Sequence, residues 1–244
     1  MDLYVLEVKY SFGGKEDVLY PVVLRHEGEA LLADCGYAGF LPLLEESANR
    51  QGLVLQDLTG LVITHHDMDH MGCAAELRAA YPGLKVYASA VEKPYVEGFL
   101  KSLRLQQAED LYPCLAEEQK PGALQFRQGL KSVRPVAVDA VLVPGKDISF
   151  LPGVRVISTP GHMPGHISLY WAEQKTLVAA DALVYEHGRL EIANPQYTLD
   201  LPAALDSIKK LQQLDIDTVV CYHGGVVRGG VQEALEDLAA RYGC

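Results

Sequence analysis

Apolar and polar residues alternate along the first third of the chain with a period of two, which is the period of half-buried β-strands. Residues 3–8 follow this pattern, and two further strands are predicted over residues 18–27 and 29–34. Pro21 has no backbone N–H, so the strand that contains it is expected at an edge or in an irregular position. The N-terminal third is therefore predicted to be mainly β-structure.

Helical periodicity begins at residues 40–52, where Gly52 marks the expected C-terminal end. Short apolar runs and helical segments then follow one another. Helices are predicted over residues 73–81, over residues 201–214 with Asp200 as cap, and from Val231 onwards. Strands are predicted over residues 60–64, 84–89, 136–144, 148–150, 154–159, 167–171, 176–180 and 218–222. Two sheets packed face to face with helices outside would satisfy this order, so we expect a single α/β domain over residues 1–244.

A Leu- and Gln-rich segment, residues 94–132, interrupts the strands. It is predicted to form two helices, broken around Pro113 and around Pro121-Gly122. A helical insertion of this kind can be a lid over a site, the surface of a homodimer or ordinary packing. The sequence leaves these alternatives open.

The formal net charge of −11, without any run of basic residues, argues against a nucleic-acid partner. No apolar stretch approaches the ~20 residues that a membrane helix needs, and the N-terminus shows no signal-peptide pattern. The five cysteines are scattered without a CxxC pair, which fits a reducing compartment. We expect a cytoplasmic protein that acts on a small molecule and has no membrane partner.

Residues with metal-ligating side chains stand where predicted strands end. Four of them fall within six consecutive residues after the strand at 60–64, and three more follow later strands. These residues are His65, Asp67, Asp69, His70, His162, Asp181 and His223. One histidine after a strand is usually an ordinary loop residue, but seven such residues at strand ends indicate a metal site.

Side-chain parity divides these residues between two ions. In an extended loop, His65 and Asp67 project to one side and can share the first ion with His162. Asp69 and the adjacent His70 then turn toward a second ion. His223 completes the second site, with Asp181 as a bridge between the two ions. Two ions about 3.5–4 Å apart with an open position form a hydrolytic geometry.

The segments THHDMDHMG, STPGHMPGHIS, AADAL and CYHGG together resemble the metallo-β-lactamase superfamily. The resemblance spans residues 30–225 and implies a four-layer αββα sandwich with two divalent ions, expected to be zinc with manganese or iron as alternatives. Asp34 resembles the early aspartate of that family, and both Asp34 and His166 are expected to orient a ligand or a loop. The segments DAL and NPQYTLD resemble a branch of small lactonase- or esterase-like hydrolases.

The motif departs from the family at Asp67, which stands where a second histidine is usual, so that the motif reads HxDxDH. The adjacent His66 has the wrong parity to replace it. A carboxylate makes the site more anionic, and we expect it to favour harder ions such as Mn²⁺ or Fe²⁺ and to raise the pKa of the bridging water.

The expected reaction is hydrolysis of an activated lactone or ester carbonyl by a hydroxide that bridges the two ions. Asp69 is the candidate for moving the proton to the leaving group, and Tyr185 is a candidate for contacting the oxyanion, with Tyr197 as a weaker one. A glyoxalase II-like thioesterase is the main alternative. A diiron redox module without its flavin partner is the alternative from a different class. Tyr95, Phe99, Leu103 and Phe126 could form an apolar acyl pocket, but could equally belong to the core or to a dimer interface.

Overall fold

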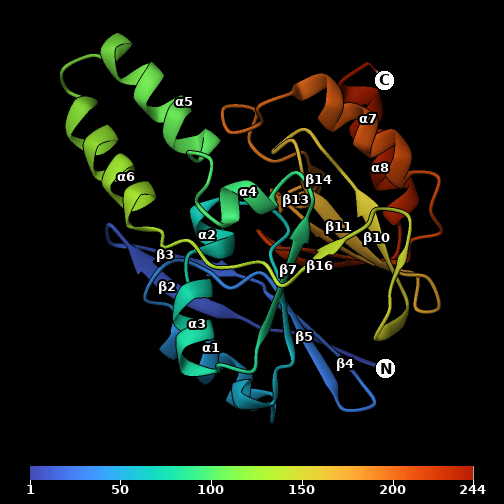
Figure 1. The fold of residues 1–244 in the computed structure, drawn as a ribbon. Helices are drawn as coiled ribbons and strands as arrows, with labels where there is room; N and C mark the ends of the chain where they lie inside the picture. Colours follow the sequence, from blue (N-terminus) through green and yellow to red (C-terminus); the bar gives the residue numbers. More distant parts are fainter. Residues whose placement is uncertain (244) are drawn as a thin grey trace.

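The computed structural model describes residues 1–243 as two six-stranded sheets with helices on their outer faces (Figure 1). The first sheet has the order β1 (Asp2–Val5), β4 (Val22–His26), β5 (Glu29–Ala33), β6 (Gly60–Val62), β7 (Lys85–Ser89) and β8 (Ala140–Leu142). The second has the order β16 (Gly225–Arg228), β15 (Thr218–Cys221), β12 (Thr176–Ala180), β11 (Ile167–Trp171), β10 (Leu151–Ser158) and β9 (Asp147–Ile148). Strands β5 to β8 run parallel, as do β12 and β15.

The remaining elements cover or extend these sheets. The hairpins are β2 (Val8–Phe12) with β3 (Lys15–Leu19), and β13 (Val184–Glu186) with β14 (Arg189–Glu191). The helices are α1 (Leu41–Arg50), α2 (Met68–Met71), α3 (Ala74–Ala80), α4 (Lys93–Val96), α5 (Leu103–Leu111), α6 (Lys120–Ser132), α7 (Leu201–Leu211) and α8 (Val231–Arg241), with short 3₁₀ turns at Leu55–Asp57 and Tyr112–Cys114. Within residues 1–243, no helix has the length and apolarity needed to cross a bilayer.

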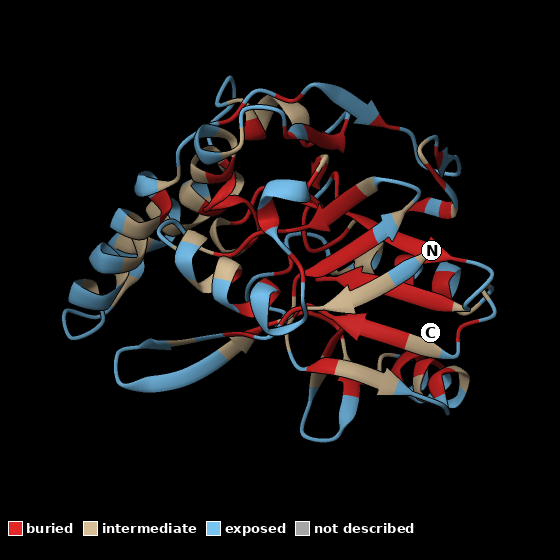
Figure 2. Cartoon of the chain, turned by 90° about the horizontal axis from the view of Figure 1, so that it is seen from below, coloured by how far each residue is buried: buried red, intermediate tan, exposed pale blue. Residues whose placement is uncertain are grey.

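Strand alternation produces three apolar layers. On β5, Leu31 faces the second sheet and packs in one cluster with Val156 of β10, while its neighbour Leu32 faces outward. Leu32 packs with Leu44 of α1 and other residues of α1 and α3. The outer face of the second sheet is covered in the same way by α7 and α8, for example through Leu235. The central strands are buried on both faces (Figure 2). This arrangement is the predicted αββα sandwich.

Several element boundaries differ from the sequence prediction. Pro21 ends a strand instead of occupying one: β3 stops at Leu19 and β4 begins at Val22. The Pro21 carbonyl instead accepts a hydrogen bond of 2.8 Å from the backbone N–H of Leu6. Only Ala140–Leu142 of the strand predicted at 136–144 is paired. The short strands β13, β14 and β16 were not predicted, because they have few apolar residues to show a period.

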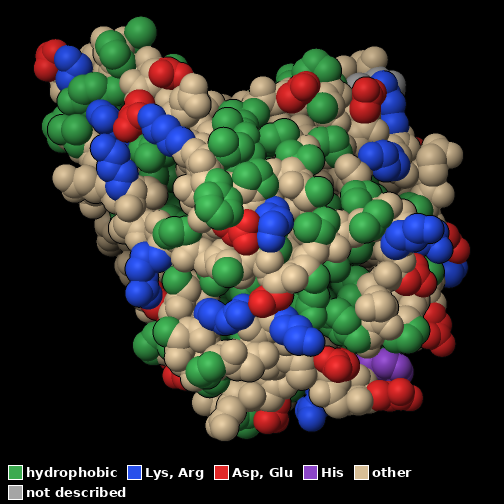
Figure 3. Space-filling view, in the orientation of Figure 1, with side chains coloured by type: hydrophobic (Ala, Val, Ile, Leu, Met, Phe, Trp, Pro, Cys, Tyr) green, Lys and Arg blue, Asp and Glu red, His purple; other side chains and the backbone are tan. Residues whose placement is uncertain are grey.

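The insertion forms helices as predicted, with α5 and α6 as a hairpin that projects from the sandwich (Figure 1). Pro121 does not break a helix. It lies in the first turn of α6, where the missing N–H costs no hydrogen bond. In the space-filling view a notch separates the outer part of this hairpin from the part of the molecule that contains α7 and α8 (Figure 3). Four free cysteines are described. Cys35, Cys73 and Cys221 are buried and Cys114 is exposed, while Cys244 lies outside the described residues.

Candidate metal centre

The seven predicted ligand residues come together where the strands of both sheets end. His65, Asp67, Asp69 and His70 follow β6 of the first sheet, whereas His162, Asp181 and His223 follow β10, β12 and β15 of the second. Five of the seven line a cavity of about 510 Å³, namely Asp67, Asp69, His162, Asp181 and His223. His65 and His70 lie below them and are fully buried.

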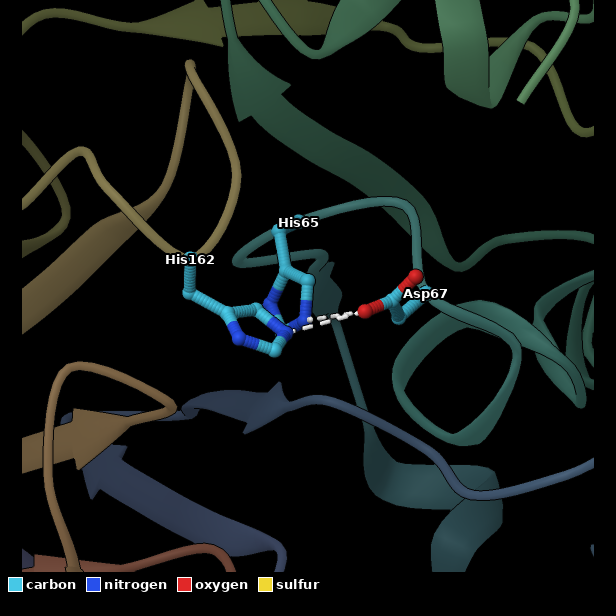
Figure 4. Close-up of side chains that lie close together, drawn as sticks. All are labelled: His65, Asp67 and His162. Atoms are coloured by element: carbon cyan, nitrogen blue, oxygen red, sulfur yellow. Dashed lines mark hydrogen bonds and ion pairs between the residues drawn. The ribbon is translucent and has the colours of Figure 1, made fainter. Parts of the chain in front are cut away.

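The first group consists of His65, Asp67 and His162, whose ligand atoms all lie within 4.8 Å of one another. Asp67 Oδ2 is 2.9 Å from His162 Nε2 and 3.6 Å from His65 Nε2. Both imidazole rings point toward this one carboxylate oxygen from different loops (Figure 4). The group therefore presents two nitrogen atoms and one oxygen atom to a shared point.

The second group consists of Asp69, His70 and His223. Asp69 Oδ2 is 3.1 Å from His223 Nε2 and 3.7 Å from His70 Nε2. Asp181 lies between the two groups. Its Oδ2 is 3.4 Å from His162 Nε2, and its Oδ1 is 3.2 Å from His70 Nε2. One oxygen of Asp181 thus faces each group, which is the placement that a bridging carboxylate requires.

Three of the central atoms in the described part of the chain are buried without a hydrogen-bond partner: His65 Nε2, His70 Nε2 and Asp181 Oδ1. Buried polar groups that make no hydrogen bond are costly, and each such group needs an explanation. All three belong to one metal-compatible set of His65, His70 and Asp181. The imidazole and carboxylate donors fit Zn²⁺, Mn²⁺ or Fe²⁺, and these residues could hold a divalent cation.

The local backbone differs from the extended loop that the sequence predicted. Asp67 is extended (φ −72°, ψ 152°), but the helical turn α2 begins at Met68 and contains both Asp69 and His70. The parity rule therefore holds for His65 and Asp67 only. Asp69 and His70 both reach the second group from successive positions of a helical turn, whose side chains project about 100° apart, so strand parity does not describe them.

Asp34 and Thr64 contact the Nδ1 atoms of His70 and His65, on the side of each ring that faces away from the centre. Asp34 Oδ2 accepts a 2.7 Å hydrogen bond from the Thr64 hydroxyl and lies 2.8 Å from His70 Nδ1. The Thr64 hydroxyl is also 3.1 Å from His65 Nδ1. These contacts leave the Nε2 atoms of both rings for the centre. Such partners fix the tautomer and the ring orientation of metal-binding histidines. The expectation that Asp34 orients ligand side chains matches this geometry.

His166 supports the bridging aspartate. Its Nε2 accepts a 3.1 Å hydrogen bond from the Asp181 backbone N–H, and its Nδ1 lies 2.8 Å from the Thr159 hydroxyl. Burial, followed by the charge of His162, lowers the pKa of His166 to about 3. The ring is therefore neutral at pH 7, as an acceptor must be.

Gly161 lets the His162 loop approach α7 closely. Its φ is +138°, and a Cβ at this position would lie 2.3 Å from the Ala204 backbone nitrogen. A side chain here would push the loop away from the helix. The loop is further held by the Asp200 backbone N–H, which donates to the Gly161 carbonyl over 2.9 Å.

The ionisable side chains of the centre have pKa values shifted in different directions: His65 and Asp67 downward, and His70 upward. Burial, together with the charge of His70, lowers the pKa of His65 well below its usual range. Burial would raise the pKa of Asp67, but hydrogen bonds to His162 and His65 and the charge of Arg104 outweigh it, so the pKa lies well below normal. Burial would lower the pKa of His70, but Asp181 and other carboxylates raise it well above normal. The neighbouring carboxylates thus favour the charged form of His70, and a metal ion would compete with a proton for this ring.

Three neighbours of the centre were missed by sequence reasoning: Glu92, Arg104 and Tyr222. Glu92 is fully buried and accepts the backbone N–H groups of His66 (3.0 Å) and Gly165 (2.8 Å), thereby joining the two ligand loops. Its side chain also contacts the His66 ring. The parity argument thus placed His66 correctly away from the metal groups. No sequence pattern marked Glu92 or Arg104.

Tyr222 directly precedes His223, which is the one sequence signal that could have identified it. Its hydroxyl donates a 2.7 Å hydrogen bond to the Asp69 carbonyl and accepts one of 3.0 Å from the backbone N–H of Gly36. The ring centroid lies 4.1 Å from that of His70. Tyr222 therefore fixes α2 against the end of β15.

The cavity above the centre is lined by both polar and apolar residues, and Asp17, Arg104, Glu186 and Asn194 are among the polar ones. Tyr185 and Tyr197 both line it, together with Met68, Phe126, Leu130 and Val184. Of the predicted acyl-pocket residues, only Phe126 belongs to this lining. Tyr95 instead stacks on His66 with a centroid distance of 4.4 Å, and Phe99 is 79% exposed. Leu103 begins α5 and does not line the cavity either.

Comparison with known proteins agrees with this geometry. A family model described as the metallo-beta-lactamase superfamily matches residues 19–223. The probable metallo-hydrolase YflN of Bacillus subtilis (strain 168) is 29% identical over 214 residues, covering 82% of this chain and 76% of that protein. A hydroxyacylglutathione hydrolase of Synechococcus sp. (strain JA-2-3B'a(2-13)) is 24% identical over 229 residues, covering 91% and 72% of the two chains.

Solved structures share the fold. A metallo-beta-lactamase family protein from Thermus thermophilus superposes with a TM-score of 0.74 at 24% identity, covering 98% of this chain and 79% of that one. A beta-lactamase domain protein from Burkholderia ambifaria gives a TM-score of 0.70 at 20% identity, covering 98% and 72%. With the fold, the matched family model and the clustered His and Asp residues together, the chain belongs to the metallo-β-lactamase superfamily of metal-dependent hydrolases.

Proposed function

We propose that this protein hydrolyses a lactone or an ester with two divalent metal ions at the site formed by its seven His and Asp residues. The observation that carries the proposal is the set of three buried ligand atoms without a hydrogen-bond partner, next to a cavity lined by both polar and apolar residues. When bound, the ions would supply an activated water and positive charge for the carbonyl oxygen. Zinc is the proposed metal, with manganese or iron as alternatives.

The residues of the chain have separable tasks in this reaction. His65, Asp67 and His162 would hold the first ion, Asp69, His70 and His223 the second, and Asp181 would contact both. Asp69 is also one of the carboxylates that line the cavity, so it is placed to carry a proton toward the leaving oxygen. Met68, Phe126 and Leu130 would contact the apolar part of the substrate and exclude water.

Thioester hydrolysis is the second candidate. It is supported by the hydroxyacylglutathione hydrolases among the relatives, one of which, from Chelativorans sp. (strain BNC1), is 37% identical over 112 residues, or 41% of each chain. A redox reaction at two iron ions is the candidate from a different class, and visible absorption together with iron content would identify it.

The test is a hydrolysis panel of lactones, aryl esters, thioesters and β-lactams, run on protein of measured metal content. Asp69→Asn should abolish hydrolysis of the preferred substrate. As a control, Asp57→Asn makes the same chemical change at an exposed residue of the 3₁₀ turn Leu55–Asp57 and should leave this hydrolysis unchanged. A preference for thioesters would select the second candidate. A metal-loaded protein that hydrolyses none of the four classes would reject both.

A further inference from the structure

Arg104 is a buried arginine on a hairpin whose other residues are mostly half-buried or exposed, and it reaches the metal centre. It is the second residue of α5 and only 3% exposed. Its Nε lies 3.2 Å from Asp67 Oδ1, and its Nη2 lies 2.8 Å from Asp67 Oδ2. These two contacts form the parallel fork that arginine makes with a carboxylate. The partner is the one residue at which the motif departs from its family.

The other contacts of Arg104 hold the guanidinium in place. Nη2 also donates to the Tyr197 carbonyl over 2.6 Å, and Nη1 donates to Gln107 Oε1 over 2.7 Å. The Tyr197 ring lies 5.2 Å from Arg104 Cζ. Arg104 lines the cavity, but four of the five N–H groups of its guanidinium are engaged with protein atoms, which leaves little hydrogen-bonding capacity for a substrate. Its role must be sought in what it does to Asp67.

The adjacent residue adds a second link between the insertion and the ligand loop. The Leu103 backbone N–H donates to His66 Nε2 over 3.3 Å. The first turn of α5 is therefore attached to two consecutive residues, His66 and Asp67. The attachment fixes the direction of the Asp67 carboxylate. Oδ1 accepts from Arg104 Nε, and Oδ2 accepts from Arg104 Nη2 while also facing His65 and His162.

The charges of the pair explain how an aspartate can occupy a position that is usually neutral. Replacing a histidine ligand by Asp67 adds one negative charge to the first group, and the buried guanidinium of Arg104 supplies one positive charge 2.8 Å away. Buried ions are stable only when they are paired in this way. The expectation that Asp67 makes the site more anionic did not include this cation.

We propose that Arg104 is a positioning residue for the first metal group. Its guanidinium orients the Asp67 carboxylate and cancels its charge, so that Asp67 acts in the manner of a neutral ligand. This inference rests on the proposed function, because it requires a divalent ion at His65, Asp67 and His162. It follows that the first site keeps a preference for zinc, despite its carboxylate.

A double-mutant cycle on metal binding tests the pair. Zinc affinity is measured by competition with a chromophoric chelator, and the Co²⁺ spectrum monitors the first site. Asp67→His alone leaves the Arg104 charge buried without its partner and should weaken zinc binding at the first site by about 10- to 100-fold. Adding Arg104→Met to that variant removes the unpaired charge and should restore zinc affinity to within about threefold of wild type.

The single variants separate charge from orientation. Arg104→Met leaves Asp67 unpaired and should shift the preference of the first site from Zn²⁺ toward Mn²⁺ by about tenfold. Arg104→Lys keeps the charge without the fork, so it should hold the preference while weakening binding. Arg127→Met is the matched control, since Arg127 is an insertion arginine that pairs with Glu109 and Tyr112 instead. It should change neither quantity.

The possible results distinguish the two proposals. The role of Arg104 alone would be overturned if wild type binds two equivalents of metal but the double variant shows no rescue and Arg104→Met keeps the same preference between Zn²⁺ and Mn²⁺. Failure of wild type to bind metal at the first site would overturn the proposed function. Metal binding at the second group, formed by Asp69, His70 and His223, provides an internal measure that each variant is folded.

Discussion

Glu92 is predicted to be the most important residue for stability that lies outside the ligand set. It is fully buried and accepts two backbone N–H groups, one from His66 at 3.0 Å and one from Gly165 at 2.8 Å. Each buried donor left without a partner costs about 1–3 kcal/mol. Glu92→Ala should therefore lower the free energy of unfolding by about 2–6 kcal/mol, a large part of the ~5–15 kcal/mol typical of a domain.

Glu92→Gln is a milder version of the same perturbation. The amide keeps the shape and one acceptor oxygen, but its NH₂ group must face a second N–H donor. One hydrogen bond is lost instead of two, so the expected cost is about 1–3 kcal/mol. Because Glu92 joins the loops of His65 and His162, both variants should also weaken metal binding at the first group.

Denaturant unfolding of the chelator-treated protein provides the measurement. Trp171 is the single tryptophan and is buried between the sheets, so its fluorescence reports on the inter-sheet core. The exposed Glu118, changed to Ala or Gln, is the control and should move the unfolding free energy by no more than about 0.5 kcal/mol. If Glu92→Ala lowers the free energy of unfolding by less than about 1 kcal/mol with an unchanged m-value, the cost assigned to the two unpaired backbone N–H groups is wrong.

The centre and its cavity lead to three more predictions. Burial would lower the pKa of His70, but the charges of Asp181 and other carboxylates raise it, so a proton and a metal ion compete for this ring. Metal affinity should therefore fall as the pH is lowered, and calorimetry in two buffers of different ionisation enthalpy should detect proton release; equal heats in both buffers would contradict this. Tyr222→Phe removes the hydroxyl that holds the Asp69 carbonyl and should lower the free energy of unfolding by about 1–3 kcal/mol, as measured by denaturant titration. Phe126→Ala opens the cavity wall and should raise KM about tenfold for substrates with long acyl chains but little for short ones; an equal rise for both would remove Phe126 from the binding site.

The fold and the ligand residues could be predicted from the sequence because both produce local sequence patterns. Strand alternation placed Leu31 and Leu32 on opposite faces, and the ligands stand directly after apolar runs. The boundaries that were missed involve residues whose structure depends on distant partners. Pro21, for example, lies between β3 and β4, and its carbonyl accepts the N–H of Leu6, from a segment that no local pattern connects to it.

The partners of the ligands were not accessible in the same way. Arg104 lies 37 residues from Asp67 along the chain, in a segment without regular spacing relative to the motif. A buried salt bridge of this kind depends on how α5 docks, which hydrophobic periodicity does not encode. The hypothesis of a more anionic first site was incomplete for that reason. Tyr222 was adjacent to a ligand, but an apolar strand end explained it equally well.

The division of the ligands between the two sheets has a consequence for how the protein matures. One half of the chain supplies His65 to His70 and the other supplies His162, Asp181 and His223, so neither half alone can assemble either ligand group. The ions can bind tightly only after the halves have packed against each other, and they cannot nucleate that step. Once bound, each ion would add RT ln(1 + [M]/Kd) to the stability of the packed state, where [M] is the free metal concentration and Kd its dissociation constant. Loss of metal would therefore remove this contribution from the packing of the two halves against each other.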